Sequence, residues 1–116
     1  HLPEYRDTIA FHCQQATEKY IKSLMIFFEI KVKKTHKLIF LLDLVDEKET
    51  IPELFFDKAA ALEDYEVKIR YPHKIIQLSD EDIRDAIKIA RDFRAFATKR
   101  MNININYDDI LNKTDF

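Results

Sequence analysis

The 116-residue chain contains no glycine, and this absence limits the folds that are open to it. P-loops and dinucleotide-binding turns need glycine, because their backbone must approach phosphate closely. Tight two-residue hairpins also rely on glycine for positive φ angles. The sequence therefore excludes the glycine-rich nucleotide-binding folds and disfavours sheets built from tight hairpins.

The composition is that of one folded domain. Hydrophobic residues make up 47% of the chain and aromatic residues 12%, which is enough for a single modest core. The net charge of −2 argues against a generally basic nucleic-acid binder. Cys13 is the only cysteine, so an internal disulfide and a cysteine-rich zinc site are excluded. With no visible signal peptide and no membrane-length apolar run, we expect a cytoplasmic protein without a membrane partner.

Apolar residues at helical spacing predict about four helices. Their expected bounds are Pro3 or Glu4 to Glu29, Thr35 or His36 to Val45, Pro52 to Pro72, and Ser79 to Arg100. Ser79 and Asp82 form a capping-box pattern at the start of the last helix. We therefore predict an all-α fold, an antiparallel up-and-down bundle over residues 1–101. Residues 102–116 are expected to form a tail or arm.

The first predicted helix carries both apolar and polar side chains at helical spacing. Its apolar stripe is expected to contain Ile9, Cys13, Ala16, Tyr20, Leu24 and Phe27, with Phe11, Ile21, Met25 and Phe28 broadening it. Its polar face is expected to contain His12, Gln15, Glu18, Lys19 and Lys22. Two later segments, 34–36 and 70–73, are predicted to converge on this polar face and form a partly basic groove.

The segment Lys34-Thr35-His36 lies where the second helix is expected to begin. Thr35 is placed to cap that helix, which sets His36 in its first turn, where backbone amides favour an anion. Four lysines, at positions 31, 33, 34 and 37, add positive charge. The pattern predicts a phosphate site, although a helix cap beside a solvated histidine fits the same residues.

The segment Arg70-Tyr71-Pro72-His73 lies at the predicted end of the third helix. There the Arg70 guanidinium can bind phosphate or carboxylate through two hydrogen bonds, with Tyr71 offering a flat face or a hydroxyl. In the alternative interpretation, Arg70 only neutralises the carbonyl end of its own helix.

Arg6 and His12 are further candidates, in this case for catalysis. In a ribonuclease, the histidine would act as general acid or base and the arginine would stabilise the phosphorane. Six positions separate the two residues, however, which puts them on different faces of a regular helix. His12 packed against a neighbouring helix or a dimer partner is the alternative. The four histidines show no metal-binding spacing, so no metal site is predicted.

Taken in order, these segments resemble the HEPN domain family (higher eukaryotes and prokaryotes nucleotide-binding) of the minimal prokaryotic type. The resemblance covers about residues 5 to 100 and rests on Phe11 to Lys19 with Lys22, Lys34 to Leu38 with Leu41 and Leu42, Leu62 and Tyr65 leading into Arg70-Tyr71-Pro72, and Ala86 and Ala90. It implies a nucleotide-binding homodimer that acts with a minimal nucleotidyltransferase in a toxin–antitoxin-like module. The ligand would be ATP or another nucleotide, without a cofactor. By position, the implied nucleotide-binding residues are Lys34, His36, Arg70, Tyr71 and His73, with Gln15 and Lys19 behind them.

The chain departs from the family pattern in two respects. Family members usually carry one more amphipathic helix ahead of the position of Glu4, so we expect either that this leading helix was lost from the sequence or that the chain is truncated. The ribonuclease branches use a longer Arg-to-His spacing near the start of the last helix, whereas the stretch here reads Arg70-x-x-His73. The short spacing disfavours metal-independent RNA cleavage and favours a non-enzymatic role. A metal-independent ribonuclease toxin acting on RNA and a non-catalytic interaction or dimerisation module stay open as alternatives.

Overall fold

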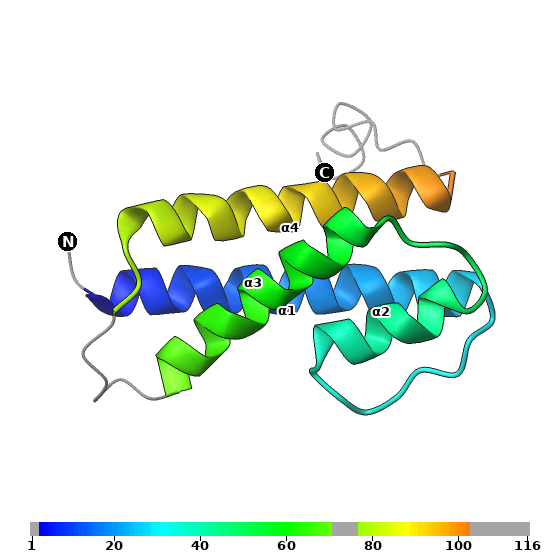
Figure 1. The fold of residues 1–116 in the computed structure, drawn as a ribbon, viewed down its shortest axis with the longest axis horizontal. Helices are drawn as coiled ribbons and strands as arrows, with labels where there is room; N and C mark the ends of the chain where they lie inside the picture. The colour runs from blue at the N-terminus through cyan, green and yellow to red at the C-terminus, as the bar shows by residue number, and fades with distance from the viewer. Residues whose placement is uncertain (1–2, 71–76, 103–116) are drawn as a thin grey trace, which may run out of the picture.

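The structure is a computed structural model that describes residues 3–70 and 77–102. These residues form four helices (Figure 1): α1 (Pro3–Phe27), α2 (Leu38–Asp46), α3 (Glu53–Arg70) and α4 (Asp80–Arg100). No strand occurs in these two segments. The prediction of an all-helical bundle of four helices is confirmed. Most of the predicted tail, residues 103–116, lies outside the described residues, as do Tyr71 and His73.

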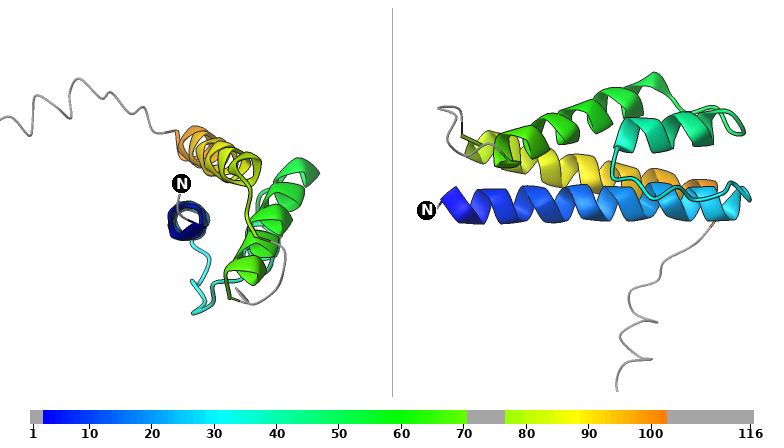
Figure 2. Two further views of the ribbon diagram at one scale, coloured as in Figure 1. Left: turned by 90° about the vertical axis from the view of Figure 1, so that its left-hand side faces the viewer. Right: turned by 90° about the horizontal axis from the view of Figure 1, so that it is seen from below.

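The helices do not simply alternate in direction: α1, α2 and α4 run one way and α3 runs the other way (Figure 1). α1 and α4 lie side by side and begin at the same end of the bundle (Figures 1 and 2), where Arg6 Nε and Asp80 Oδ1 pair at 2.9 Å. α3 runs opposite to α4, and the two are joined by an ion pair between Lys58 Nζ and Asp92 Oδ2 at 2.9 Å. The connection 28–37 leads the chain back along α1, so that α2 runs in the same direction as α1 (Figure 1).

The length of that connection explains the departure from strict alternation. Ten extended residues reach about 33 Å, whereas a nine-residue helix such as α2 is only about 13 Å long. The chain therefore has room to return before α2 begins. Up-and-down order holds from α2 through α3 to α4, and α1 is placed beside α4 as a parallel neighbour.

The core is built from the apolar faces of all four helices. α2 buries the four residues whose spacing predicted its inner face, Leu38, Leu41, Leu42 and Val45. α4 buries Ile83, Ala86, Ile89, Phe93 and Ala97. Between α3 and α4, the rings of Phe55 and Phe93 meet edge to face with centroids 5.1 Å apart. Burial of these apolar side chains is the main stabilising contribution to a bundle of this size.

The buried stripe of α1 differs from the predicted one. Its buried residues are Ala10, Cys13, Gln14, Thr17, Glu18, Ile21, Leu24 and Met25. Phe11 and Phe27, which were predicted to face the core, are about half exposed, at 48% and 49%. The buried stripe includes three polar side chains, and each has a hydrogen-bond partner. Gln14 bonds Glu66 on α3, Glu18 bonds Lys22 and His36, and Thr17 bonds the Cys13 carbonyl of its own helix.

The ends of the helices are closed in different ways. At α4 the predicted capping box is present, because Ser79 Oγ accepts from the Asp82 amide and Asp82 Oδ2 accepts from the Ser79 amide. α2 begins at Leu38 with Lys37 as its N-cap residue, so the prediction that Thr35 caps this helix is wrong. Thr35 Oγ1 instead accepts from the Lys37 amide at 3.2 Å, a local turn that keeps residues 35–37 outside the helix.

The C-terminus of α1 shows how a chain without glycine ends a helix. Glu29 adopts a positive φ of 59°, while its amide bonds the Ile26 carbonyl and the Ile30 amide bonds the Met25 carbonyl. This is the Schellman arrangement, in which glycine is the preferred residue at the position of Glu29. None of the described helices is long and apolar enough to cross a membrane.

Candidate functional site

His36 is tied to the bundle by a buried carboxylate of α1. Its Nδ1 lies 2.7 Å from Glu18 Oε1, and the other oxygen of Glu18 accepts from Lys22 Nζ at 2.9 Å. Glu18 is only 5% exposed, whereas the His36 side chain is 67% exposed. A buried charge thus holds an imidazole at the protein surface.

The two partners of Glu18 determine its charge state. Burial by itself raises the pKa of the Glu18 carboxyl, but the hydrogen bonds and positive charges of Lys22 and His36 outweigh that effect and lower the pKa. At neutral pH Glu18 is therefore ionised and can only accept hydrogen bonds. The proton of the contact must then lie on Nδ1 of His36, which leaves Nε2 outside this contact. Nε2 accepts a hydrogen bond when the ring is neutral and donates one to an anion when the ring is the imidazolium.

The predicted convergence of the lysine-rich segment with the polar face of α1 is found at this contact. Lys31, Lys33, Lys34 and Lys37 are all exposed in the connection that carries His36. On α1, the residue that meets the segment is Glu18, while Lys19 is exposed and Gln15 is partly buried. Unlike the expected arrangement, His36 does not lie in the first turn of α2, because the helix begins only at Leu38.

Two glutamates of α3 extend the polar contacts along the space between α1, α2 and α3. Glu63 Oε1 accepts from the Ile39 amide at 3.1 Å, and Glu66 Oε2 accepts from Gln14 Nε2 at 2.8 Å. We call Gln14, Glu18, His36, Glu63 and Glu66 the polar seam. Sequence reasoning missed three of these residues, because nothing local marks Gln14, Glu63 and Glu66 as inward-facing.

The C-terminal end of α3 follows directly after the seam residue Glu66. Arg70 is the last residue of α3 and lies one helical turn beyond Glu66, so its backbone is about 6 Å further along the helix. Its side chain, together with Tyr71 and His73, lies outside the described residues. The geometry of these three candidates relative to His36 therefore stays a prediction.

Arg6 and His12 are not brought together within one chain. Arg6 pairs with Asp80 at the start of α4, whereas His12 is exposed and its ring meets the Phe11 ring edge to face at 5.9 Å. Within residues 3–70 and 77–102 no cluster of three or more metal-ligating side chains occurs.

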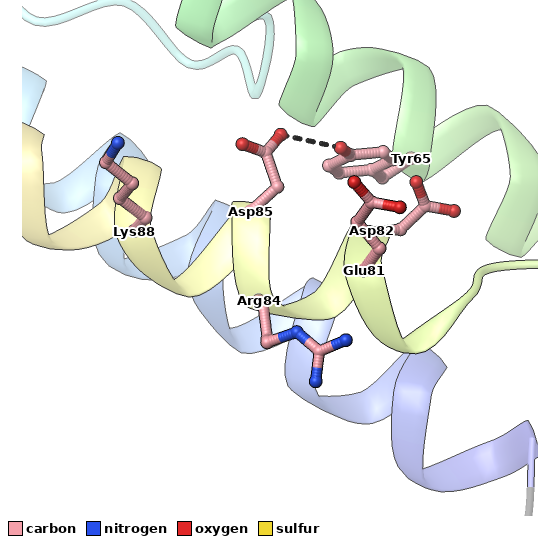
Figure 3. A pocket seen from close by; sticks show the side chains of 6 residues that line it. All are labelled: Tyr65, Glu81, Asp82, Arg84, Asp85 and Lys88. Carbon is pink, nitrogen blue, oxygen red and sulfur yellow. Dashed lines mark hydrogen bonds between the residues drawn. The ribbon is translucent and has the colours of Figure 1, made fainter.

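Apart from the polar seam, a pocket with polar lining lies between α3 and α4 (Figure 3), where Tyr65 on α3 points toward Asp85 on α4. The Tyr65 hydroxyl donates to Asp85 Oδ2 at 2.7 Å. Burial raises the pKa of Tyr65, and the hydrogen bond to Asp85 and the negative charges of Asp85, Asp82 and Asp64 raise it further. The hydroxyl therefore keeps its proton and joins two helices rather than acting as a base. The lining residues are Tyr65, Glu81, Asp82, Arg84, Asp85 and Lys88.

Comparison with known proteins identifies one family. A family model described as the HEPN domain matches residues 4–101, which is most of the chain. Comparisons with curated proteins and with solved structures gave no match.

Proposed function

The chain belongs to the HEPN domain family, and from this premise we propose that it is a nucleotide-binding helical domain. In this proposal the phosphates bind at the lysine-rich connection, where Lys34 and His36 contact them directly. The protein acts as a homodimer beside a minimal nucleotidyltransferase partner, as the two components of a toxin–antitoxin-like module.

The observation that carries the proposal is the exposed imidazole of His36 held by buried Glu18. A surface histidine is usually free to rotate, and fixing it costs side-chain entropy. Here a charge-assisted hydrogen bond at 2.7 Å offsets that cost beside four exposed lysines. A fixed imidazole among exposed lysines is suited to an anionic ligand, because the entropy cost of placing the ring is already met.

Arg70, Tyr71 and His73 are assigned to the same site by their position after the polar seam. In the proposal, Arg70 supplies a bidentate contact to a phosphate and Tyr71 supplies a flat face or a hydroxyl. Gln15 and Lys19 on α1 stand behind these groups as secondary contacts.

Calorimetric titration of the purified protein with ATP tests the proposal. We expect saturable binding that is weakened about tenfold or more by Lys34→Ala and by Arg70→Ala, because each removes one charge-assisted contact. Lys99→Ala, which removes an exposed lysine from the last turn of α4, is the matched control and should bind as the original chain does. Absence of binding by ATP, GTP and AMP at millimolar concentration would overturn the proposal.

Two other functions belong to the same family context. For a ribonuclease, the described contacts do not favour a catalytic pair within one chain, since Arg6 is bound to Asp80 and His12 is exposed. Incubating the pure protein with a mixed RNA pool tests this function directly. For an interaction module, light scattering combined with copurification of a nucleotidyltransferase measures the proposed homodimer and the proposed partner separately.

A further inference from the structure

We infer that the site on the connection 28–37 recognises the phosphate groups of its ligand rather than a nucleobase, with the Nε2–H of the His36 imidazolium as a direct donor and Glu18 as the positioning residue. The inference rests on the proposed function, because it assigns the ligand chemistry of the same site. Free nucleotides and single-stranded RNA share this phosphate chemistry.

The lysine-rich segment offers mainly groups that bind phosphate. Residues 31–37 read Lys-Val-Lys-Lys-Thr-His-Lys, which gives four ammonium groups, one imidazole and one hydroxyl. Phosphate is bound by such cations, whereas a base is bound by stacking on aromatic rings and by contacts to its edge. Two phenylalanines flank this segment at three positions on either side: Phe28, which is partly buried against the core, and Phe40, which is 46% exposed and can be tested separately.

The carboxylates of Glu18 and Glu63, which lie near the segment, already have hydrogen-bond partners inside the protein. Both oxygens of Glu18 are used, one by Lys22 and one by His36. One oxygen of Glu63 accepts from the Ile39 amide at the start of α2. Because Glu63 takes that amide, an incoming phosphate binds to side chains of the connection and not to the N-terminus of α2.

Glu18 acts on the site through the ring of His36, which it holds in place. A carboxylate on Nδ1 of a histidine fixes the ring orientation and tautomer, and so determines which atom meets a ligand. Glu18 is 5% exposed and does not reach solvent as a ligand contact would. Its effect on binding therefore passes through the side chains that it holds, His36 and Lys22, of which His36 lies on the lysine-rich connection.

A ligand series tests the recognition of phosphate. Inorganic triphosphate, ATP, adenosine and a short single-stranded RNA are titrated separately into the full chain. We expect triphosphate to bind within about threefold of ATP and adenosine to give no saturable binding, since the base adds little. RNA binding in place of ATP binding assigns the phosphates to an RNA backbone. The inference is overturned if adenosine binds as tightly as ATP, or if triphosphate fails to compete with ATP.

A variant series tests the positioning role. His36→Asn keeps a donor near the position of Nδ1 but removes Nε2, and Glu18→Gln removes the charge that holds the ring. Both should weaken triphosphate binding about tenfold, whereas Phe40→Ala and Lys99→Ala should not. Nitrogen-detected NMR of the histidine ring should show the proton on Nδ1 in the ligand-free original chain, protons on both ring nitrogens when triphosphate is bound, and mixed tautomers in ligand-free Glu18→Gln. An unchanged tautomer and unchanged affinity in Glu18→Gln would overturn the positioning role.

The two proposals fail in different ways. If triphosphate binds and ATP does not, the phosphate site stands and the assignment to nucleotides is wrong. If ATP binds only through its adenosine part, nucleotide binding stands and the phosphate inference is wrong. If neither triphosphate, ATP nor RNA binds, both are overturned.

Discussion

The carboxylate of Glu63 on α3 accepts a hydrogen bond from the backbone amide of Ile39, in the first turn of α2, at 3.1 Å. The N-cap residue of α2, Lys37, supplies no side-chain hydrogen bond to these amides. A carboxylate at this place also interacts favourably with the positive end of the helix dipole. The start of α2 is therefore fixed by a contact from another helix.

Removing that contact should destabilise the fold. Glu63→Ala leaves the amide of Ile39 without its partner, and we expect a loss of about 1 to 2 kcal/mol in the free energy of unfolding. Urea denaturation measures it. Asp64→Ala is the control, because Asp64 is exposed and lies 3.8 Å from Lys68, a pair worth at most about 0.5 kcal/mol. Equal losses in the two variants would contradict this role for Glu63.

The parts of the fold that the sequence predicted are those with local causes. The four buried positions of α2 and the capping box of Ser79 and Asp82 depend on residues within one or two turns of each other. Helix bounds followed in the same way, except at α2. There a local turn at Thr35 keeps residues 35–37 out of the helix, and a contact from Glu63, 24 positions from Ile39, fixes its first turn. No local pattern contains the second contact.

The candidate site was predictable only in part, for a related physical reason. Helical spacing identified Glu18 as one of several polar residues on α1, and a lysine-rich segment as its neighbour. Spacing does not tell which polar residues are buried, because a polar side chain can be buried only where the facing helix offers it a hydrogen-bond partner. Gln14 is buried because Glu66 faces it, 52 positions away, whereas Gln15 was the glutamine chosen from the sequence.

The adjacent glutamines of α1 provide a direct test of this distinction. Gln14 is 3% exposed and donates to Glu66, so Gln14→Ala should cost about 1 to 3 kcal/mol of stability. Gln15→Ala should be neutral within about 0.5 kcal/mol, since alanine favours the helix and little burial is lost. Thermal and urea unfolding measure both. A larger loss for Gln15→Ala would mean that α1 is rotated relative to the structure.

The end of α1 should be improvable by supplying the missing glycine. Glu29 has a φ of 59°, where a side chain is unfavourable and an acidic one also opposes the negative end of the helix dipole. Glu29→Gly should stabilise the protein by about 1 kcal/mol. Glu47→Gly is the matched control, because Glu47 has ordinary helical angles at the end of α2. It should cost about 0.5 to 1 kcal/mol, and a gain in both variants would contradict the explanation.

The bond between Tyr65 and Asp85 should make stability fall at alkaline pH. Because the pKa of Tyr65 is raised in the folded chain, its contribution is complete below the ordinary tyrosine value of 10.0 and is lost as the pH rises toward the folded value. Tyr65→Phe should lower stability by about 1 kcal/mol at neutral pH and flatten the alkaline loss. Asp85→Asn should bring the ultraviolet titration of Tyr65 to lower pH, and an unchanged titration would contradict the assigned cause.

Glu18 should have the opposite effect, at acid pH. Its pKa is lowered in the folded chain from an ordinary value of 4.5, so its contribution is present above that value and is lost as the pH falls through the folded value. Glu18→Gln removes the charge bound by Lys22 and His36 and should be less stable than the original chain at neutral pH. The difference should shrink as the pH falls below about 4, where the unfolded carboxyl is protonated. Urea unfolding across this pH range measures it. A difference that stays constant down to the acid end would mean that packing, and not the ionised carboxylate, explains why Glu18→Gln is less stable than the original chain.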